Sequence, residues 1–179
     1  ITSIPEQDRA HHFESSGTTG SQPSRHWHHE KSLDLYKTSL HPPFQKYVLN
    51  NKEWKGRTLA LTPLPAEARH SSLAHMAGHV LGSDTTHAGE RTNDGWNINW
   101  HACESACEHA IKTNRPLLIF GPAFSFLHWL DSTDTLHKLP WESRIMETGG
   151  YKGRSRVLAK NEFHVLLSKR LGISESYIV

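Results

Sequence analysis

The sequence predicts an α/β protein whose largely parallel sheet is flanked by helices. Two observations lead to this fold class: from Arg57 onward short apolar runs alternate with stretches of helical period, and residues 116–121 are apolar at nearly every position. Parallel strands need crossover connections of about helix length, and a strand covered on both faces is apolar throughout. Because ligands of such sheets bind beyond the carboxyl ends of the strands, functional residues are expected there.

The first half of this pattern runs from residue 58 to residue 99. Residues 58–65 (TLALTPLP) form an apolar run closed by prolines and are predicted to be a strand. A helix is expected next, capped by Ser71 or Ser72 and ended by Gly82, because its apolar residues fall on one face. Residues 83–99 are rich in turn-forming Asp, Gly and Asn and are predicted to be a loop.

The second half of the pattern repeats the alternation. Helices are predicted at 102–111, 122–131 and 159–171, strands at 116–121 and 143–150, and the start of a further strand at 177–179. Pro122 suits a first helical turn, and Gly172 suits a helix end. Residues 1–55, in contrast, are polar and weakly periodic, so we divide the chain into a polar segment, 1–55, and an alternating core, 56–179.

The ends of the chain and its two cysteines lead to expectations about the length of the parent protein and its cellular location. The chain begins with Ile1 and ends in SESYIV, which resembles the start of a strand, so we expect an internal fragment of a longer protein. No apolar run reaches the roughly 18 to 20 residues that a membrane span needs. Cys103 and Cys107 lie four apart on one predicted helix, where they are poor disulfide partners. We therefore expect a cytoplasmic protein without a membrane span.

Charge and histidine content narrow the kinds of partner. The net charge is +2 with interspersed acids and bases, which predicts no nucleic-acid binding and leaves phosphorylated small molecules open. The segment HACESACEH offers four soft metal ligands: His101, Cys103, Cys107 and His109. Both cysteines occupy the apolar stripe of their helix, so structural cysteines and no metal site are predicted.

A run of small residues, SSGTTG, follows the aromatic Phe13. Its glycines can turn backbone amides toward a ligand and its hydroxyls add donors, which suits the oxygens of a di- or triphosphate. No Gly-Lys-Ser/Thr follows, so this is not the Walker pattern. Composition alone also fits a flexible loop, and it favours that alternative.

Two further segments can carry chemistry at predicted strand ends. In ETGGYKGRSR, paired glycines would let a flat ring approach the backbone, Tyr151 offers a stacking face, and the cations could meet phosphate. The alternative is a solvated basic turn. His70 lies at the start of a helix just past a strand, where an anion is favoured and the imidazole could orient an acid substrate. A surface histidine is the alternative.

The order of these segments resembles the N-terminal portion of the adenylate-forming (acyl-adenylating) enzyme superfamily. The segments are FESSGTTG, LTPLP with His70, LLIFGPAFSFLHWL, SRIMETGGYKGR, and a helix leading into YIV. METGGYKGRSR and HSSLAHM most resemble the acyl-protein synthetases, the long-chain fatty-acid luciferin-component ligases. The resemblance covers residues 13–179.

The resemblance implies a two-step reaction. A carboxylic acid, expected to be a fatty acid, reacts with ATP to give an acyl-adenylate and pyrophosphate, and a thiol then takes the acyl group. The implied cofactors are ATP and Mg²⁺, and the implied partners include an acyl-accepting protein or a reductase. A coenzyme A ligase of acyl or aryl acids, and a non-catalytic nucleotide- or acyl-binding module, are the alternatives.

The resemblance also implies roles for single residues. His70 would be the catalytic residue near the acyl carboxylate. The β- and γ-phosphates would be held by Ser15, Ser16, Gly17, Thr18, Thr19 and Gly20. The adenine side of the nucleotide site would be lined by Gly149, Gly150, Tyr151, Lys152 and Gly153.

Departures from the family pattern limit this expectation. The phosphate loop of the superfamily continues with Pro-Lys-Gly, whereas here Pro23 is followed by Ser24 and Arg25, so Arg25 is a candidate replacement for the lysine. The magnesium-binding Glu, the ribose-binding Asp, the acyl-accepting Cys and the small C-terminal domain would all lie beyond Val179. The fragment alone is therefore expected to be inactive.

Overall fold

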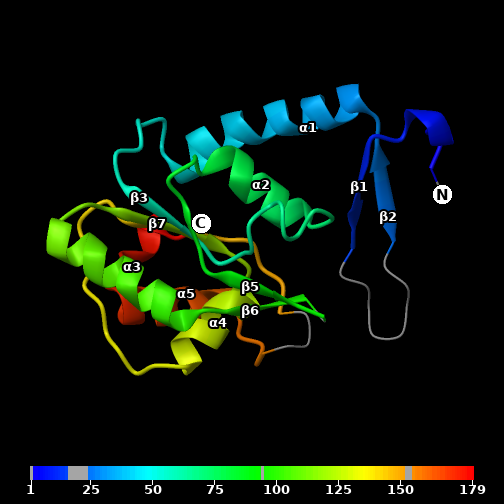
Figure 1. Cartoon of the computed structure of the whole chain (residues 1–179). Helices are drawn as coiled ribbons and strands as arrows, with labels where there is room; N and C mark the ends of the chain where they lie inside the picture. The colour runs from blue at the N-terminus through cyan, green and yellow to red at the C-terminus, as the bar shows by residue number, and fades with distance from the viewer. Residues whose placement is uncertain (1, 16–23, 94, 152–154) are drawn as a thin grey trace.

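A four-stranded parallel sheet forms the centre of the protein in a computed structural model that describes residues 2–15, 24–93, 95–151 and 155–179 (Figure 1). Its strand order is β4-β3-β7-β8. The strands are β3 (Arg57–Ala60), β4 (Thr86–His87), β7 (Leu117–Gly121) and β8 (Arg144–Glu147). The predicted α/β class with a parallel sheet is thereby confirmed.

Helices cover both faces of this sheet, because side chains of the central strands alternate between two apolar clusters. Leu117 and Ile119 of β7 belong to a cluster with α3 (Trp100–Thr113), α4 (Ala123–Asp131) and α5 (Lys160–Leu171). Leu118 and Phe120 belong to a second cluster that includes α2 (Ser72–Val80). All five residues of β7 are buried, as the apolar run predicted.

Predicted helix boundaries agree with the caps in the structure. The Ser71 hydroxyl accepts a hydrogen bond from the backbone N–H of Ala74 (3.2 Å) at the start of α2. Pro122 is the residue before α4. Gly172 ends α5 with a left-handed φ of 67°.

The prediction of a loop at 83–99 is wrong. This segment contains β4 and an antiparallel hairpin of β5 (Gly89–Thr92) and β6 (Gly95–Ile98). Its strands are short and polar, and they are held by tertiary contacts such as buried Trp96. Gly89 lies very close to the backbone of the segment that follows β3, because a Cβ added to it would be 2.3 Å from Pro63 N. Packing of this kind leaves little trace in the local sequence pattern.

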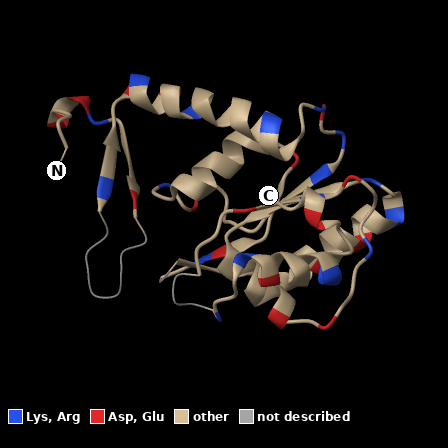
Figure 2. Ribbon diagram, turned by 180° about the vertical axis from the view of Figure 1, so that it is seen from behind, with Lys and Arg blue, Asp and Glu red and all other residues tan. Residues whose placement is uncertain are grey.

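The polar N-terminal segment is ordered into a hairpin and a long helix. Strands β1 (His11–Glu14) and β2 (Arg25–His28) pair antiparallel, and α1 (Glu30–Pro43) continues into a π-helical turn, Phe44–Val48. Figures 1 and 2 show the hairpin at one end of α1, at the edge of the molecule. Figure 2 also shows acidic and basic residues interspersed along the chain.

The predicted strand at 177–179 begins one residue late. A 3₁₀ turn covers Glu175–Tyr177, and Ile178 then forms a parallel bridge with Ile145 of β8. Among the helices that the structure describes, none has both the length and the apolar character needed to cross a membrane.

Candidate functional site

The hairpin and His70 meet directly in the structure. The backbone N–H of Glu14 donates to the carbonyl oxygen of His70 (2.9 Å), and His70 Nδ1 donates to the carbonyl oxygen of His12 (3.1 Å). A carbonyl oxygen can only accept, so Nδ1 carries the proton and Nε2 of a neutral His70 keeps its lone pair. The strand that leads into the predicted phosphate loop is thus attached to the predicted catalytic histidine.

Two serines close the base of the loop. Ser15 N donates to the carbonyl oxygen of Ser24 (2.9 Å), and the Ser15 hydroxyl accepts from both Ser24 N and Ser24 Oγ, each at 3.0 Å. The Ser15 hydroxyl is therefore engaged within the hairpin. The other predicted phosphate ligands lie outside the described residues: Ser16, Gly17, Thr18, Thr19 and Gly20.

Arg25 forms an ion pair at the same place. Its Nε lies 3.1 Å from Glu14 Oε1, and His12 Nε2 lies 3.3 Å from the same oxygen. Burial opposes ionisation of Glu14, but the hydrogen bonds from His12 and Arg25 outweigh it and lower the pKa of this carboxyl. The guanidinium that could replace the family's lysine is therefore tied to an ionised acid through Nε, while 61% of its side chain stays exposed.

The paired glycines form a fixed turn after β8. Gly149 and Gly150 have φ values of 66° and 79°, a left-handed conformation that favours glycine. Their carbonyl oxygens accept from the first two amides of α4, Ala123 N (2.9 Å) and Phe124 N (3.3 Å). The turn thereby caps the N-terminus of α4. Backbone conformation rather than crowding requires the glycines, since an added Cβ at either one meets nothing within 4 Å.

Tyr151 is half-buried beside this turn. Its ring meets Phe163 edge to face (6.2 Å between centroids), and its hydroxyl donates to the carbonyl oxygen of Leu158 (3.0 Å). These contacts fix the ring against α5. The predicted neighbours Lys152 and Gly153 lie outside the described residues.

A partly buried carboxylate–imidazole pair at the end of β8 was not predicted from the sequence. Glu147 Oε2 accepts from Gly149 N (2.7 Å), and Glu147 Oε1 lies 3.4 Å from His164 Nε2 of α5. The two side chains are only 9% and 13% exposed. The pair joins the end of β8 to α5 beside the glycine turn. The only sequence signal was an acid at the end of an apolar strand.

A hollow of about 820 Å³ opens at the carboxyl ends of β3 and β4. His87 Nδ1 lies 3.2 Å from the carbonyl oxygens of both Thr62 and Pro63, and Arg91 donates to the carbonyl oxygen of Glu67. The lining is mixed in charge and consists of Leu64, Ala66, Glu67, Thr85, His87, Gly89, Glu90 and Arg91. This is the sheet edge where ligands of parallel sheets bind.

The predicted residues thus fall into two groups. Ser15, Arg25 and His70 come together at the base of the hairpin, while Gly149, Gly150 and Tyr151 form the turn after β8. In the described parts of the chain, no hydrogen bond joins the first group to the second.

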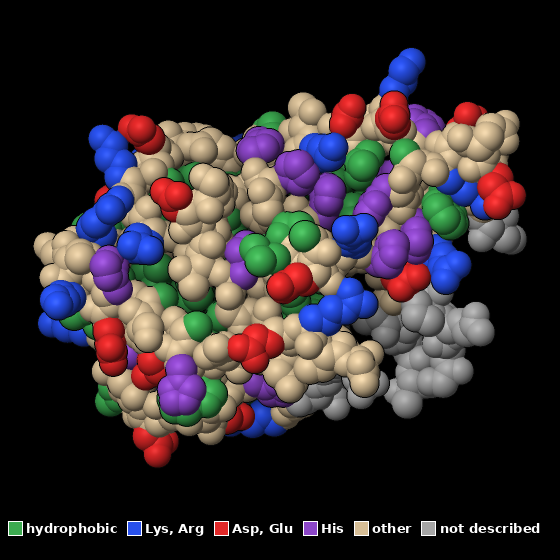
Figure 3. Space-filling view, in the orientation of Figure 1, with side chains coloured by type: hydrophobic (Ala, Val, Ile, Leu, Met, Phe, Trp, Pro, Cys, Tyr) green, Lys and Arg blue, Asp and Glu red, His purple; other side chains and the backbone are tan. Residues whose placement is uncertain are grey.

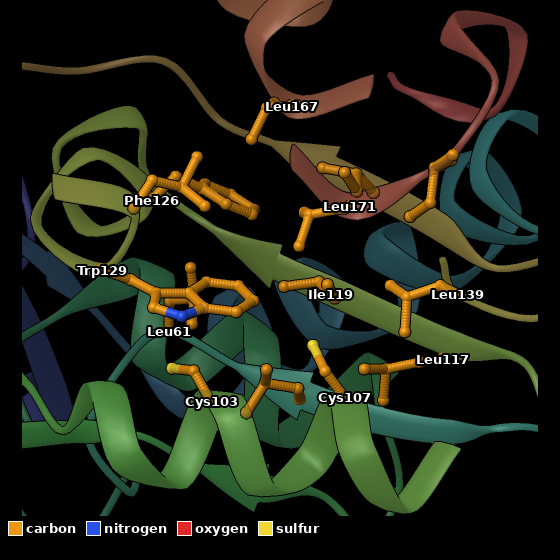
Figure 4. Close-up of a cluster of buried hydrophobic side chains, with 14 of the residues drawn as sticks. Leu61, Cys103, Cys107, Leu117, Ile119, Phe126, Trp129, Leu139, Leu167 and Leu171 are labelled. Atoms are coloured by element: carbon orange, nitrogen blue, oxygen red, sulfur yellow. The ribbon is translucent and has the colours of Figure 1, made fainter. Parts of the chain in front are cut away.

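The cysteines are core residues, as predicted. Cys103 and Cys107 point into the cluster that contains Ile119 and Trp129 (Figure 4), and burial raises the pKa of both thiols. His109 instead faces Arg57. No group of three or more His, Cys, Asp or Glu residues is placed to hold a metal ion in the described ranges.

Comparison with models of known protein families gives no match, and a search of curated proteins gives none either.

Proposed function

We propose that this chain is the nucleotide-binding part of an ATP-dependent acid–thiol ligase of the acyl-protein synthetase type. The observation that carries the proposal is the contact between Glu14 and His70, 56 positions apart in sequence. It sets the base of the Ser/Thr/Gly loop beside the imidazole proposed to meet the acid. A nucleophilic carboxylate and the phosphate that it attacks must be held close together in such a reaction.

In the first step a carboxylate oxygen of the acid attacks the α-phosphorus of ATP. The bond from that phosphorus to the β-phosphate oxygen breaks, and pyrophosphate leaves with the electron pair. In the second step a thiolate attacks the acyl carbon, and AMP leaves. His70 uses its Nδ1–H for the carbonyl oxygen of His12, so it would bind the acid's carboxylate through an Nε2–H, as the protonated imidazole.

Charge at the hairpin base supports phosphate binding. Arg25 uses Nε for Glu14 and keeps its other guanidinium donors on an exposed side chain. Charge-assisted hydrogen bonds are each worth roughly 1.5 to 3 kcal/mol, so several donors are needed for a triphosphate. Mg²⁺ with ATP is held mainly by phosphate oxygens, water and one or two carboxylates. Glu14 is already paired, so no described residue is assigned as its ligand.

The proposal is tested by acid-dependent ATP–pyrophosphate exchange with a panel of fatty and aromatic acids, in a protein that contains this chain together with the C-terminal domain of the family. Exchange with at least one acid is expected, and Thr18→Ala and Gly150→Trp should each depress it strongly. Absence of exchange with every acid would refute the enzymatic function. Unchanged exchange in both variants would remove the site assignment.

A second candidate is a non-catalytic nucleotide- or acyl-binding module. It is favoured by the pairing of Arg25 with Glu14, because Arg25 is the candidate replacement for the family's phosphate-binding lysine. ATP binding without acid-dependent pyrophosphate release would support this candidate. Transfer of label to coenzyme A, in the presence of acid and ATP, would instead identify a coenzyme A ligase.

A further inference from the structure

Histidines line the interface between strand β1 and helix α2. Five imidazoles, here called the histidine row, follow one another across it: His12, His70, His11, His75 and His79. Successive ring centroids are 4.0, 6.0, 6.0 and 4.6 Å apart. Figure 3 shows histidine side chains gathered on the face where the hairpin meets the helices. The row therefore contributes to the contact that attaches the hairpin to the rest of the protein.

The row has little capacity to accommodate added protons. Nε2 of His11 and Nε2 of His75 are both buried and have no hydrogen-bond partner. Glu14 is the one carboxylate that the described residues bring into contact with the row, and it is shared between His12 and Arg25. A proton added at Nε2 of His11 or of His75 would therefore be buried without an acceptor.

Residues packed around the row make protonation still less favourable. The α1 helix brings Lys37 and His41, and β2 brings His28. Among the described neighbours of His11, the carbonyl of Arg69 favours its charged form. Tyr36 and Phe13 add apolar ring faces against His75.

The same surroundings lower the pKa of three imidazoles of the row. Burial, followed by the charges of His79, His11, Lys37 and His28, lowers the pKa of His75 from 6.5 to about 4. Burial also lowers the pKa of His11 and of His79.

We propose that the histidine row is an acid-sensitive latch: its imidazoles hold the hairpin against α2, and protonation of His11, His75 and His79 in mildly acidic conditions releases it. The latch acts on the described strands and requires no bound nucleotide. Its success or failure is therefore independent of the proposed ligase function.

The sign of the effect follows from the pKa values. A histidine with a lower pKa in the latched state takes up a proton on release, so the latch is complete above about pH 6.5 and weakens as the pH falls toward 4. For His75 alone, these two values weaken the latch roughly 25-fold between pH 7.5 and pH 5. Because its ring is partly exposed, we expect about 5- to 25-fold.

Hydrogen–deuterium exchange of the full chain at pH 7.5 and pH 5.0 tests the latch, with rates corrected for intrinsic exchange. Peptides that cover β1, including the Glu14 amide bonded to His70, should lose about 5- to 25-fold of their protection at pH 5.0. Peptides that cover β7 should keep theirs. Unchanged protection in β1, or a simultaneous loss in β1 and β7, would overturn the proposal.

Variants separate titration from packing. His75→Phe keeps a ring beside Phe13 and Tyr36 but cannot be protonated. Its loss of exchange protection in β1 at pH 5.0 should therefore be several-fold smaller than that of the wild type. His79→Phe serves the same purpose at the end of the row, should His75→Phe fold poorly. His101→Phe, on α3 and outside the row, is the matched control, and its β1 peptides should lose as much exchange protection at pH 5.0 as those of the wild type. Wild-type opening in both His75→Phe and His79→Phe would contradict the latch.

Discussion

The central sheet and the β1–β2 hairpin are held in place by different chemistry. Every residue of β7 is buried, with an apolar cluster on each face, whereas Phe13 is the one buried residue in the two hairpin strands. The hairpin instead docks through backbone hydrogen bonds and stacked imidazoles. The free energy of apolar burial scales with buried area and does not depend on pH, so the apolar core around the sheet is insensitive to pH. The attachment of the hairpin, in contrast, depends on the protonation of histidines. Elements that move on binding come from such weakly attached parts.

The largest expected effect tests the scaffold. Trp129 is fully buried and its Nε1–H donates to Glu104 Oε1 (2.7 Å), so Trp129→Ala should lower the free energy of unfolding by about 3–5 kcal/mol. Denaturant unfolding measures this loss. Trp141→Ala, at a position 77% exposed, is the matched control and should have a much smaller effect. Equal losses would show that the sheet does not depend on this cluster.

A smaller effect is expected where the sheet meets the candidate site. Glu147→Ala removes the acceptor of Gly149 N and the partner of His164, and should cost about 1–3 kcal/mol of unfolding free energy. Thermal unfolding checks this value, with the exposed Glu108→Ala of α3 as a control expected to show no measurable change. A Glu147→Ala protein as stable as the wild type would mean that the glycine turn is held without the carboxylate.

The acid response of the scaffold should differ from that of the hairpin. Burial opposes ionisation of Glu104, but hydrogen bonds from Trp129 and His137 prevail and lower its pKa. Its stabilising effect is therefore present above the usual pKa of 4.5 and is lost as the pH falls below it, whereas the histidine row weakens already below about pH 6.5. Glu104→Gln should cost about 1 kcal/mol at pH 7 and less at pH 3, as measured by denaturant unfolding. A cost that does not change with pH would exclude a contribution from the ionised carboxylate.

The smallest effect on stability is expected at the exposed Arg25–Glu14 pair. Arg25→Ala should change the free energy of unfolding by no more than about 1 kcal/mol, because surface ion pairs contribute little. The ATP affinity of Arg25→Ala should also be compared with that of Lys37→Ala. A much larger loss of affinity in Arg25→Ala would indicate that Arg25 contacts a phosphate. An affinity equal to that of Lys37→Ala would leave Arg25 as a residue of the hairpin base alone.

Much of the scaffold could be predicted because its signals are local. The apolar run at 116–121, the hydroxyl of Ser71 and the glycine at 172 each determine a boundary within a few residues. The strands β5 and β6 could not be predicted, since they are polar and are fixed by contacts such as Gly89 against Pro63. The hairpin strands β1 and β2 escaped prediction for the same reason.

The candidate site was less predictable than the fold. The paired glycines at the end of a predicted strand indicated a turn, and Gly149 and Gly150 form this turn after β8. The contact of His70 with Glu14 joins residues 56 positions apart, and that of Glu147 with His164 depends on how α5 packs. Local periodicity carries no information about either distance.

The two buried cysteine thiols allow opening of the core to be measured by their rate of alkylation. Cys103 and Cys107 are the only cysteines of the chain, both lie in the core, and their raised pKa values keep them as unreactive thiols. An alkylating reagent can therefore reach them only when the sheet and its helices part. Since the hairpin has no cysteine, the rate of alkylation records opening of the core and ignores every movement of the hairpin.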